Sequence, residues 1–334
     1  MSLKGLPPAL GLLLLAPACA EYLSGYDTST GNVTELLGGL IVFVPLYGAA
    51  ALLIREGARR AGRGWPTMFL LAAAFGVLQP GLIDQAMFNP SYRDISFLAP
   101  MLEPTYIPQL GIGAYLSLHW VAGHVVFSIC APIAIVESFM RPERRTTPWL
   151  GWPGTVVTAV AFAGAAWFVV RWHLETENFV PSTGQLAGAG AVVLALVAVA
   201  FAVRTRPGPA DSRPAPGPWV VGGVTFVLMS VSQVLEWTTS LVDWTGFAVY
   251  AGRLAVLAVL LVLWSRRTGW GQIHRLAAAG AALLAQAAGA FVTQPIGDVS
   301  TAAKLGHNTA FALGVVVLII VAGKKAAGKK AELR

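Results

Sequence analysis

Residues 245–267 read TGFAVYAGRLAVLAVLLVLWSRR, an apolar run that ends in the pair Arg266-Arg267. A helix needs roughly 20 mostly apolar residues to cross a bilayer. The run therefore predicts a membrane-spanning helix over 245–265. One charged residue, Arg253, lies inside it, roughly 12 Å from the end opposite the arginine pair if each residue rises as in an α-helix.

The rest of the chain has the same character. Of its 334 residues, 56% are hydrophobic and 12% are charged, and the mean hydropathy is +0.66. Soluble domains carry roughly 25% charged residues, so this chain has too little charge to cover a surface that faces water. We expect an all-α, polytopic integral membrane protein with about ten transmembrane helices. The expected spans are 6–24, 36–55, 66–84, 113–139, 150–171, 184–204, 218–240, 245–265, 273–293 and 304–322.

The distribution of charge supports this layout, because cytoplasmic loops carry the excess of Lys and Arg. With the N-terminus inside, ten spans place 19 of the 23 basic residues on the inner side and 11 of the 16 acidic residues on the outer side. This alternation predicts a protein of the bacterial inner membrane with both termini in the cytoplasm. The first span also fits a signal peptide, since Ala18-Cys19-Ala20 has the form of a cleavage site.

Two features of the first four expected helices recur in the last four. Residues 59–65 align with 266–272, and this alignment sets Gln79 opposite Gln286 without a gap. We expect two parallel four-helix repeats, as in some transporters; chance similarity between Ala- and Gly-rich helices is the alternative. The chain then divides into a first repeat (1–140), a connector of two helices with an inner linker (141–216), and a second repeat with a basic tail (217–334).

Polar side chains inside the expected spans form the candidate site, because an ionisable group within the hydrocarbon is costly and marks function by default. Arg253 needs a partner, and Glu236 on the preceding helix is the nearest acid by depth. The two residues meet in a polar pocket that opens to the outside, or they form a structural pair that fixes helix packing. The other candidate binding residues are Gln79, His124, Gln286, Glu21, Asp84 and His307.

His124 is also the candidate catalytic residue, with Ser128 one helical turn away. The alternative is a hydrogen-bonded packing role. His119 is five residues from His124, so the two do not share a helix face as the ligand pair of a metal site does.

The loops add three expectations. The longest outer loop, 84–109, contains four prolines and predicts an ordered flap that covers the pocket or caps helix ends. Residues 204–218, rich in Pro and Arg, predict an irregular inner linker. The basic tail, 324–334, is expected to lie against anionic lipid.

The inner ends of two helices carry acids beside arginines. Glu56 lies near Arg59, and Glu137 lies near Arg141. We expect both acids to form salt bridges at the inner face.

Several chemistries have no motif in this sequence. It contains no P-loop, no GxSxG and no HExxH. Cys19 and Cys130 give neither a disulfide framework nor the spacing of metal ligands. We expect no cofactor, no metal and no nucleic acid, and the expected partners are the lipid bilayer and an unknown small solute.

Short motifs in helices two to four carry a resemblance to a known family. They are LIRE at 53–56, GWP at 64–66, AFGVLQPGLI at 74–83, FNP at 88–90, HVVFS at 124–128, PI at 132–133 and VE at 136–137. This part of the chain resembles a family of uncharacterised bacterial multi-pass membrane proteins, which brings no assigned activity.

The resemblance also implies one departure. Relatives of this type have a Glu-Glu-Gly-Leu motif where this chain has Gln79-Pro80. Paired glutamates followed by a membrane His resemble the CAAX-protease-like intramembrane enzymes. Gln79 supplies no carboxylate for a general base or a metal ligand, and this chain also lacks that superfamily's EExxxR and two-His pattern.

Three functions follow from these observations. A transporter or small-solute-binding permease predicts a cavity near mid-membrane that holds Glu236, Arg253, Gln79 and His124 together. An intramembrane hydrolase acting on a lipid or peptide predicts His124 within hydrogen-bond reach of a carboxylate. A non-catalytic assembly or partner protein predicts that every intramembrane polar group is paired.

Overall fold

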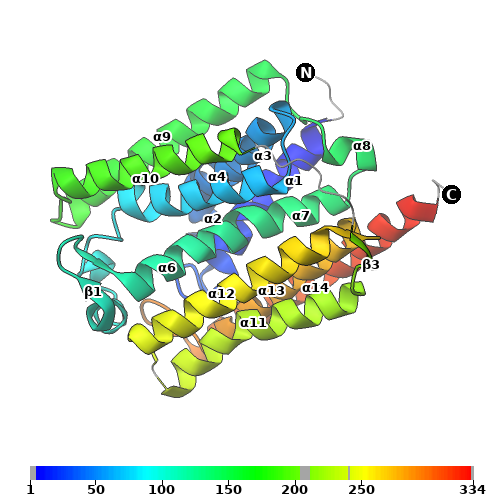
Figure 1. Cartoon of the computed structure of the whole chain (residues 1–334). Helices are drawn as coiled ribbons and strands as arrows, with labels where there is room; N and C mark the ends of the chain where they lie inside the picture. The colour runs from blue at the N-terminus through cyan, green and yellow to red at the C-terminus, as the bar shows by residue number, and fades with distance from the viewer. Residues whose placement is uncertain (1–4, 204–210, 240, 332–334) are drawn as a thin grey trace.

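The computed structural model describes residues 5–203, 211–239 and 241–331, without the side chains of 232, 236–239 and 328–331. The chain forms a bundle of long helices that run side by side, with short loops at both ends (Figure 1). Its α-helices are α1 (Leu6–Pro17), α2 (Val33–Phe43), α3 (Ala49–Arg60), α4 (Trp65–Leu78), α5 (Leu98–Leu102), α6 (Ala114–Gly123), α7 (Ala131–Ser138), α8 (Pro142–Arg145), α9 (Trp152–Thr176), α10 (Thr183–Ala202), α11 (Pro218–Thr239), α12 (Trp244–Ser265), α13 (Gln272–Ala290) and α14 (Thr301–Ala331).

Each of the ten expected spans coincides with a helix or a helix pair. Among the described residues, eight helical segments are long and apolar enough to cross a membrane; they are Val33–Arg60, Trp65–Ile83, Ala114–Ser138, Trp152–Thr176, Thr183–Ala202, Pro218–Leu235, Trp244–Ser265 and Thr301–Ala327. Leu6–Tyr22 is apolar but shorter. The all-α polytopic fold is therefore confirmed, while a count of ten crossings stays a prediction.

Four of these helices contain a π-helical turn, and each turn lies within two residues of a proline. A proline has no N–H to donate to the carbonyl one turn earlier, which loosens the helix at that point. The turns and their prolines are Ala18–Tyr22 after Pro17, Val44–Gly48 with Pro45, Gln79–Ile83 with Pro80, and His124–Cys130 before Pro132.

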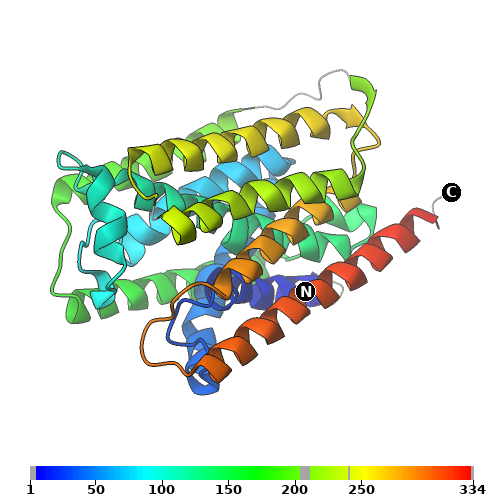
Figure 2. The ribbon, with the colours of Figure 1, turned by 90° about the horizontal axis from the view of Figure 1, so that it is seen from below.

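The core lies around α7 and α13. All eight residues of α7 are buried, and α13 packs against α7, α11 and α14. Small residues make this packing possible, because a Cβ on Gly280 of α13 would lie 2.8 Å from the Ile319 side chain of α14. At the periphery, α2 has no buried residue, and α14 runs along one edge of the bundle (Figure 2).

The two ends of the bundle differ. One end, which we call the flap end, carries residues 84–113, including α5 and the antiparallel pair β1 (Tyr106–Ile107) and β2 (Ile112–Gly113). The other, which we call the arginine end, carries α8 and the strands β3 (Asp211–Pro214) and β4 (Arg267–Thr268); α1 begins there and α14 ends there (Figure 1).

The structure corrects the prediction for the linker over 211–214. β3 (Asp211–Pro214) pairs in parallel with β4 (Arg267–Thr268). Asp211 forms an ion pair with Arg213 of the same strand at 2.8 Å and one with Arg267 at 3.7 Å, and the second pair holds the linker to the loop before α13. Residues 204–210 lie outside the described part of the chain.

The internal repeat stays a prediction. The two expected halves differ in one respect, since π-helical turns occur in residues 18–130 and none is present in the described residues of α11 to α14.

Candidate functional site

Tyr47 is the centre of a polar cluster in the flap half of the bundle. Its ring is buried, with 3% of its surface exposed. Its hydroxyl accepts a hydrogen bond from Gln79 Nε2 at 3.0 Å and lies within interaction range of the Glu21 carboxyl. Tyr47 lies in the second π-helical turn, Gln79 in the third and Glu21 in the first. Three loosened helices therefore place their polar side chains in contact.

Hydrogen bonds extend the cluster to a second carboxyl. Gln79 Nε2 also donates to Asp84 Oδ2 at 3.1 Å, and the Tyr26 hydroxyl donates to Glu21 Oε2 at 3.1 Å. Hydrogen bonds thus join Tyr47, Gln79 and Asp84, and a separate one joins Tyr26 to Glu21, which faces Tyr47. We call these five residues, Glu21, Tyr26, Tyr47, Gln79 and Asp84, the acid–tyrosine cluster.

Burial changes the acidity of Asp84, which follows the last π-helical residue of its helix. It raises the pKa of this carboxyl to about 7, because the surroundings disfavour the charged form. The charges of Glu21 and Glu177 also raise this pKa, whereas the backbone N–H of Ala86 and the charge of Arg93 lower it. Asp84 therefore titrates close to neutral pH.

His124 packs against this cluster from the fourth π-helical turn. Its ring stacks on Tyr47 with centroids 5.8 Å apart and meets Phe75 edge-on at 5.6 Å. Its Nδ1 is hydrogen-bonded to Ser128 Oγ at 3.0 Å. Among the described residues, no carboxylate is hydrogen-bonded to His124.

Gln79 leaves one acceptor unused. Its Nε2 makes both hydrogen bonds of the amide, and its Oε1 is buried with no hydrogen-bond partner. A buried polar atom without a partner is costly, so it usually marks strain, function or a bound group. Here the free acceptor lies on the residue that links the two carboxyls.

The flap is ordered and closes over this end. Arg93 Nη2 pairs with Asp27 at 2.9 Å, and the Arg93 backbone N–H donates to Glu177 Oε2 at 2.7 Å. The residues Ile95, Leu98, Leu102 and Leu116 form an apolar cluster that anchors the flap to α6. These contacts hold the flap, which begins at Asp84, to α6 and to the loops that contain Asp27 and Glu177.

The remaining candidates lie in other surroundings. Arg253 Nη1 donates to Leu228 O at 3.0 Å, and its guanidinium lies 4.0 Å from the Tyr250 ring centroid. Gln286 accepts from Gln233 at 3.3 Å. The side chain of Glu236 lies outside the described residues, so its pairing with Arg253 stays a prediction.

His307, on α14, contacts the helical turn that carries Glu21 of the acid–tyrosine cluster. Its Nε2 donates to Tyr22 O at 2.9 Å, and its ring packs against Phe311 at 4.6 Å. Since Tyr22 is the neighbour of Glu21 in the same π-helical turn, α14 buttresses the backbone that carries this acid.

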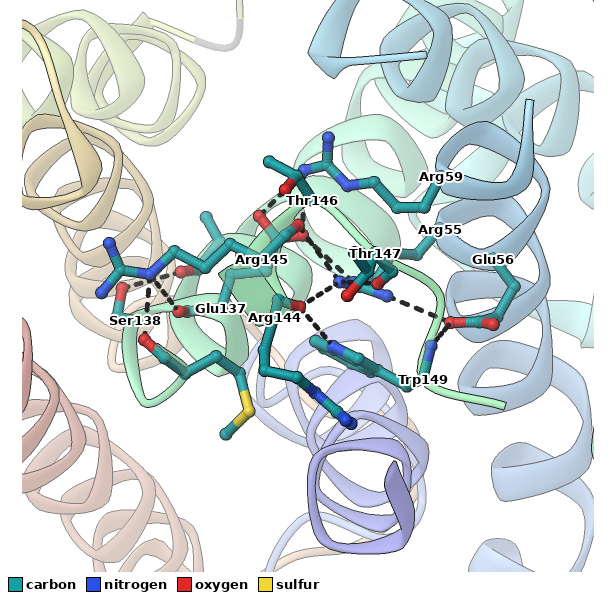
Figure 3. A network of polar contacts seen from close by, with 12 residues as sticks. Arg55, Glu56, Arg59, Glu137, Ser138, Arg144, Arg145, Thr146, Thr147 and Trp149 are labelled. Atoms are coloured by element: carbon teal, nitrogen blue, oxygen red, sulfur yellow. Dashed lines mark hydrogen bonds and ion pairs between the residues drawn. The ribbon is translucent and has the colours of Figure 1, made fainter. Parts of the chain in front are cut away.

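The arginine end contains a second polar group, which we call the arginine–glutamate network: Arg55, Glu56, Arg59, Arg60 and Glu137. Figure 3 labels Arg55, Glu56, Arg59 and Glu137. Glu137 Oε1 pairs with Arg55 at 3.1 Å and with Arg59 at 2.9 Å. Glu56 pairs with Arg55 at 3.0 Å and with Arg60 at 3.6 Å. Side chains of Arg55, Glu56 and Glu137 are fully buried.

The expected inner salt bridges thus form, but with partners other than those expected. The backbone of Glu137 and Met140 binds Arg145 Nε at 3.1 and 3.0 Å. Arg55 Nη2 donates to the carbonyls of Arg144, Arg145 and Thr147. Arg55 and Arg145 were therefore missed as inner-network residues, although LIRE and VE in the family motifs contain Arg55 and both acids.

Two hollows in the surface have linings that include none of these residues. A hollow of about 480 Å³ lies against α9 and is lined by Trp167, Phe168, Arg171, Trp172 and Glu175. Another, of about 240 Å³, lies beside the flap. Within the described part of the chain, no group of three or more His, Cys, Asp or Glu side chains is placed to hold a metal ion.

The matched part of the chain includes both polar groups. Residues 10–168 match the model of an uncharacterized membrane protein family. The match confirms the resemblance that the short motifs carry, and it covers Glu21, Tyr47, Gln79, Asp84 and His124. No curated protein and no solved structure matches the chain significantly. The family match and the long apolar helices together show that this chain is a multi-pass membrane protein.

Proposed function

We propose that the protein is a permease of the bacterial inner membrane that binds a small solute with an ammonium group at the acid–tyrosine cluster. The observation that carries this proposal is the meeting of four proline-associated π-helical turns at Tyr47. Such turns are rare, and those in α-helices frequently occur at functional sites. Each turn here brings a polar or ionisable side chain from a different part of the bundle to one place.

The chemistry of the cluster favours a cation that donates hydrogen bonds. Glu21 and Asp84 supply carboxyl oxygens, and Gln79 Oε1 is a buried acceptor with no partner. A compact ammonium group donates in several directions and carries one positive charge, so it balances one ionised carboxylate. The charge pattern supports the flap end as the outer end, with both termini in the cytoplasm.

Two observations weigh against the alternative functions. An intramembrane hydrolase needs His124 beside a carboxylate, and its hydrogen bond is to Ser128. In an assembly protein whose polar groups serve only to hold helices together, buried polar atoms are expected to be paired. Gln79 Oε1 is buried and has no hydrogen-bond partner.

Uptake of radiolabelled methylammonium by proteoliposomes tests the proposal. The variant Glu21→Gln keeps the size of the side chain and removes its charge. We expect uptake at subsaturating methylammonium to fall at least about tenfold, because a hydrogen bond to a charged group contributes about 1.5–3 kcal/mol.

Glu35→Gln is the matched control, since Glu35 is exposed at the same end of the bundle. Its uptake should equal that of the unmodified protein. Uptake no faster than in protein-free liposomes, or an equal loss in both variants, would contradict the proposal.

A further inference from the structure

The arginine–glutamate network contains guanidinium groups that its acids do not saturate. Arg55 is saturated, because it binds both Glu56 and Glu137 and three loop carbonyls. Its guanidinium also lies 3.3 Å from the Trp149 ring centroid. Arg59 and Arg145, which also contact Glu137, are held less completely.

Buried donors without acceptors lie on these two arginines. Arg59 uses Nη1 on the carbonyl of Arg63 and Nη2 on Glu137, and its Nε is buried with no partner. Arg145 uses Nε on the carbonyls of Glu137 and Met140, and its Nη2 is buried with no partner. Both side chains therefore contact Glu137 and retain a buried N–H to donate (Figure 3).

A third arginine adds charge to the same place. Arg275, near the start of α13, lies within electrostatic range of Glu137, Arg59 and Arg145. Its Nη1 makes only a long hydrogen bond of 3.4 Å, to Gln272 Oε1. Within the described part of the chain, Glu137 is the one carboxylate that pairs with Arg59 and acts electrostatically on both Arg145 and Arg275, and it also pairs with Arg55.

Trp65 supplies a further unused donor at the arginine end. Its Nε1 is buried with no partner, and its ring packs on the apolar cluster that includes Leu276, next to Arg275. Trp65 begins α4 directly after the loop that follows Arg59. The unsatisfied groups of this region are thus donors, and the excess charge is positive.

We propose that Arg59, Arg145 and Arg275 form a binding site for a phosphate group at the arginine end of the bundle. A phosphate has three or more acceptor oxygens, and arginine binds it with paired N–H groups in a fixed geometry. The site lies where the helices end, at the depth at which lipid headgroups and water meet. Its phosphate can belong to an anionic lipid or be free in solution. This inference does not depend on the proposed function.

Thermal unfolding of the full chain in dodecyl maltoside distinguishes the two sources. One arm adds sodium phosphate against sodium chloride of equal ionic strength. The other adds phosphatidylglycerol against the uncharged diacylglycerol with the same acyl chains. A ligand that binds only the folded state raises the unfolding temperature, and the rise grows with the logarithm of the ratio of its concentration to its Kd. A rise with phosphate alone indicates a soluble ligand, and a rise with phosphatidylglycerol alone indicates a lipid headgroup.

Two variants identify the site. Arg275→Gln removes a charge without breaking an ion pair to Glu137, so the arginine–glutamate network stays intact. In this variant the affinity for the phosphate group should fall roughly tenfold. Arg266→Gln removes an exposed arginine at the same end and should bind like the unmodified protein. Arg145→Gln should repeat the loss if it elutes as a folded monodisperse species. No rise with either ligand, or an equal rise in all variants, would overturn the proposal.

Discussion

At the residue scale, Asp84 and Gln79 have different roles in the acid–tyrosine cluster. Asp84 supplies a carboxyl group, and Gln79 supplies a neutral amide. The amide of Gln79 donates to both Tyr47 and Asp84, and a carboxylate in its place would repel Asp84. A neutral amide at position 79 therefore matches the surroundings of this side chain. In this chain the acids come from Glu21 and Asp84 on either side, while the residue between them is neutral.

The raised pKa of Asp84 predicts how cation binding depends on pH. Its pKa is about 7, with Glu21 and Glu177 raising it and Arg93 and the Ala86 N–H lowering it; Gln79 and the neutral Tyr47 also face it. Below pH 6 the carboxyl is mostly protonated and cannot balance a cation. We expect methylammonium binding to strengthen as the pH rises from about 6 to 8 and then to level off.

The variant Asp84→Asn separates this carboxyl from other titrating groups. Its binding should be weak at every pH and should lose the rise between pH 6 and 8, measured by equilibrium binding to purified protein. Glu35→Gln should keep the rise. A rise that persists in Asp84→Asn would assign the titration to another group.

The same residues show what sequence reasoning can find. Glu21, Asp84, Gln79 and His124 stand out in the sequence because polar side chains are rare in apolar helices. Tyr47 was missed, since a tyrosine in such a helix is typical of ordinary core packing. Pro45, two residues earlier, was the available signal. A one-dimensional pattern cannot show that Tyr47 lies between Glu21 and Gln79, because these contacts join helices far apart in the chain.

At the element scale, the π-helical turns explain why hydropathy located the helices but not the site. Membrane helices tolerate proline because neighbouring groups satisfy the freed carbonyls. The apolar runs therefore continue through Pro45 and Pro80 without a break. Each turn changes the direction in which later side chains project, so residue spacing alone misassigns the faces that meet.

Glu56 ties three elements together at the arginine end. On α3 its carboxylate binds Arg55 and Arg60. It also accepts from the backbone N–H groups of Trp149 at 2.7 Å and Leu150 at 3.1 Å, just before α9 begins. In Glu56→Ala, Arg55 remains buried and loses one of its two carboxylate partners, while Glu137 remains.

We expect Glu56→Ala to lower the free energy of unfolding by about 3–5 kcal/mol, because removing one partner strands a buried charge. Titration with sodium dodecyl sulfate in mixed micelles measures this free energy. Glu143→Ala, at an exposed acid in α8, should change it by less than about 0.5 kcal/mol. A similar small change in Glu56→Ala would mean that the network contributes little to stability.

At the scale of the whole molecule, charge and burial separate the two ends of the bundle. The flap end holds the acids Glu21, Asp27 and Asp84, and the arginine end holds Arg55, Arg59 and Arg145. These acids and these arginines lie at opposite ends of the bundle. The orientation of the bundle in the membrane is inferred from the excess of basic residues, which predicts that the arginine end faces the cytoplasm.

Labelling of single cysteines in intact cells tests this orientation. The native Cys19 and Cys130 are both buried, so their background reaction with a membrane-impermeant maleimide should be slow. Glu103→Cys places an exposed thiol on the flap, and Arg266→Cys places one at the arginine end. With arginine-rich loops inside, Glu103→Cys should react in intact spheroplasts and Arg266→Cys only after permeabilisation. The reverse pattern would put the acid–tyrosine cluster on the cytoplasmic side, and the solute proposed for it would then be taken from the cytoplasm.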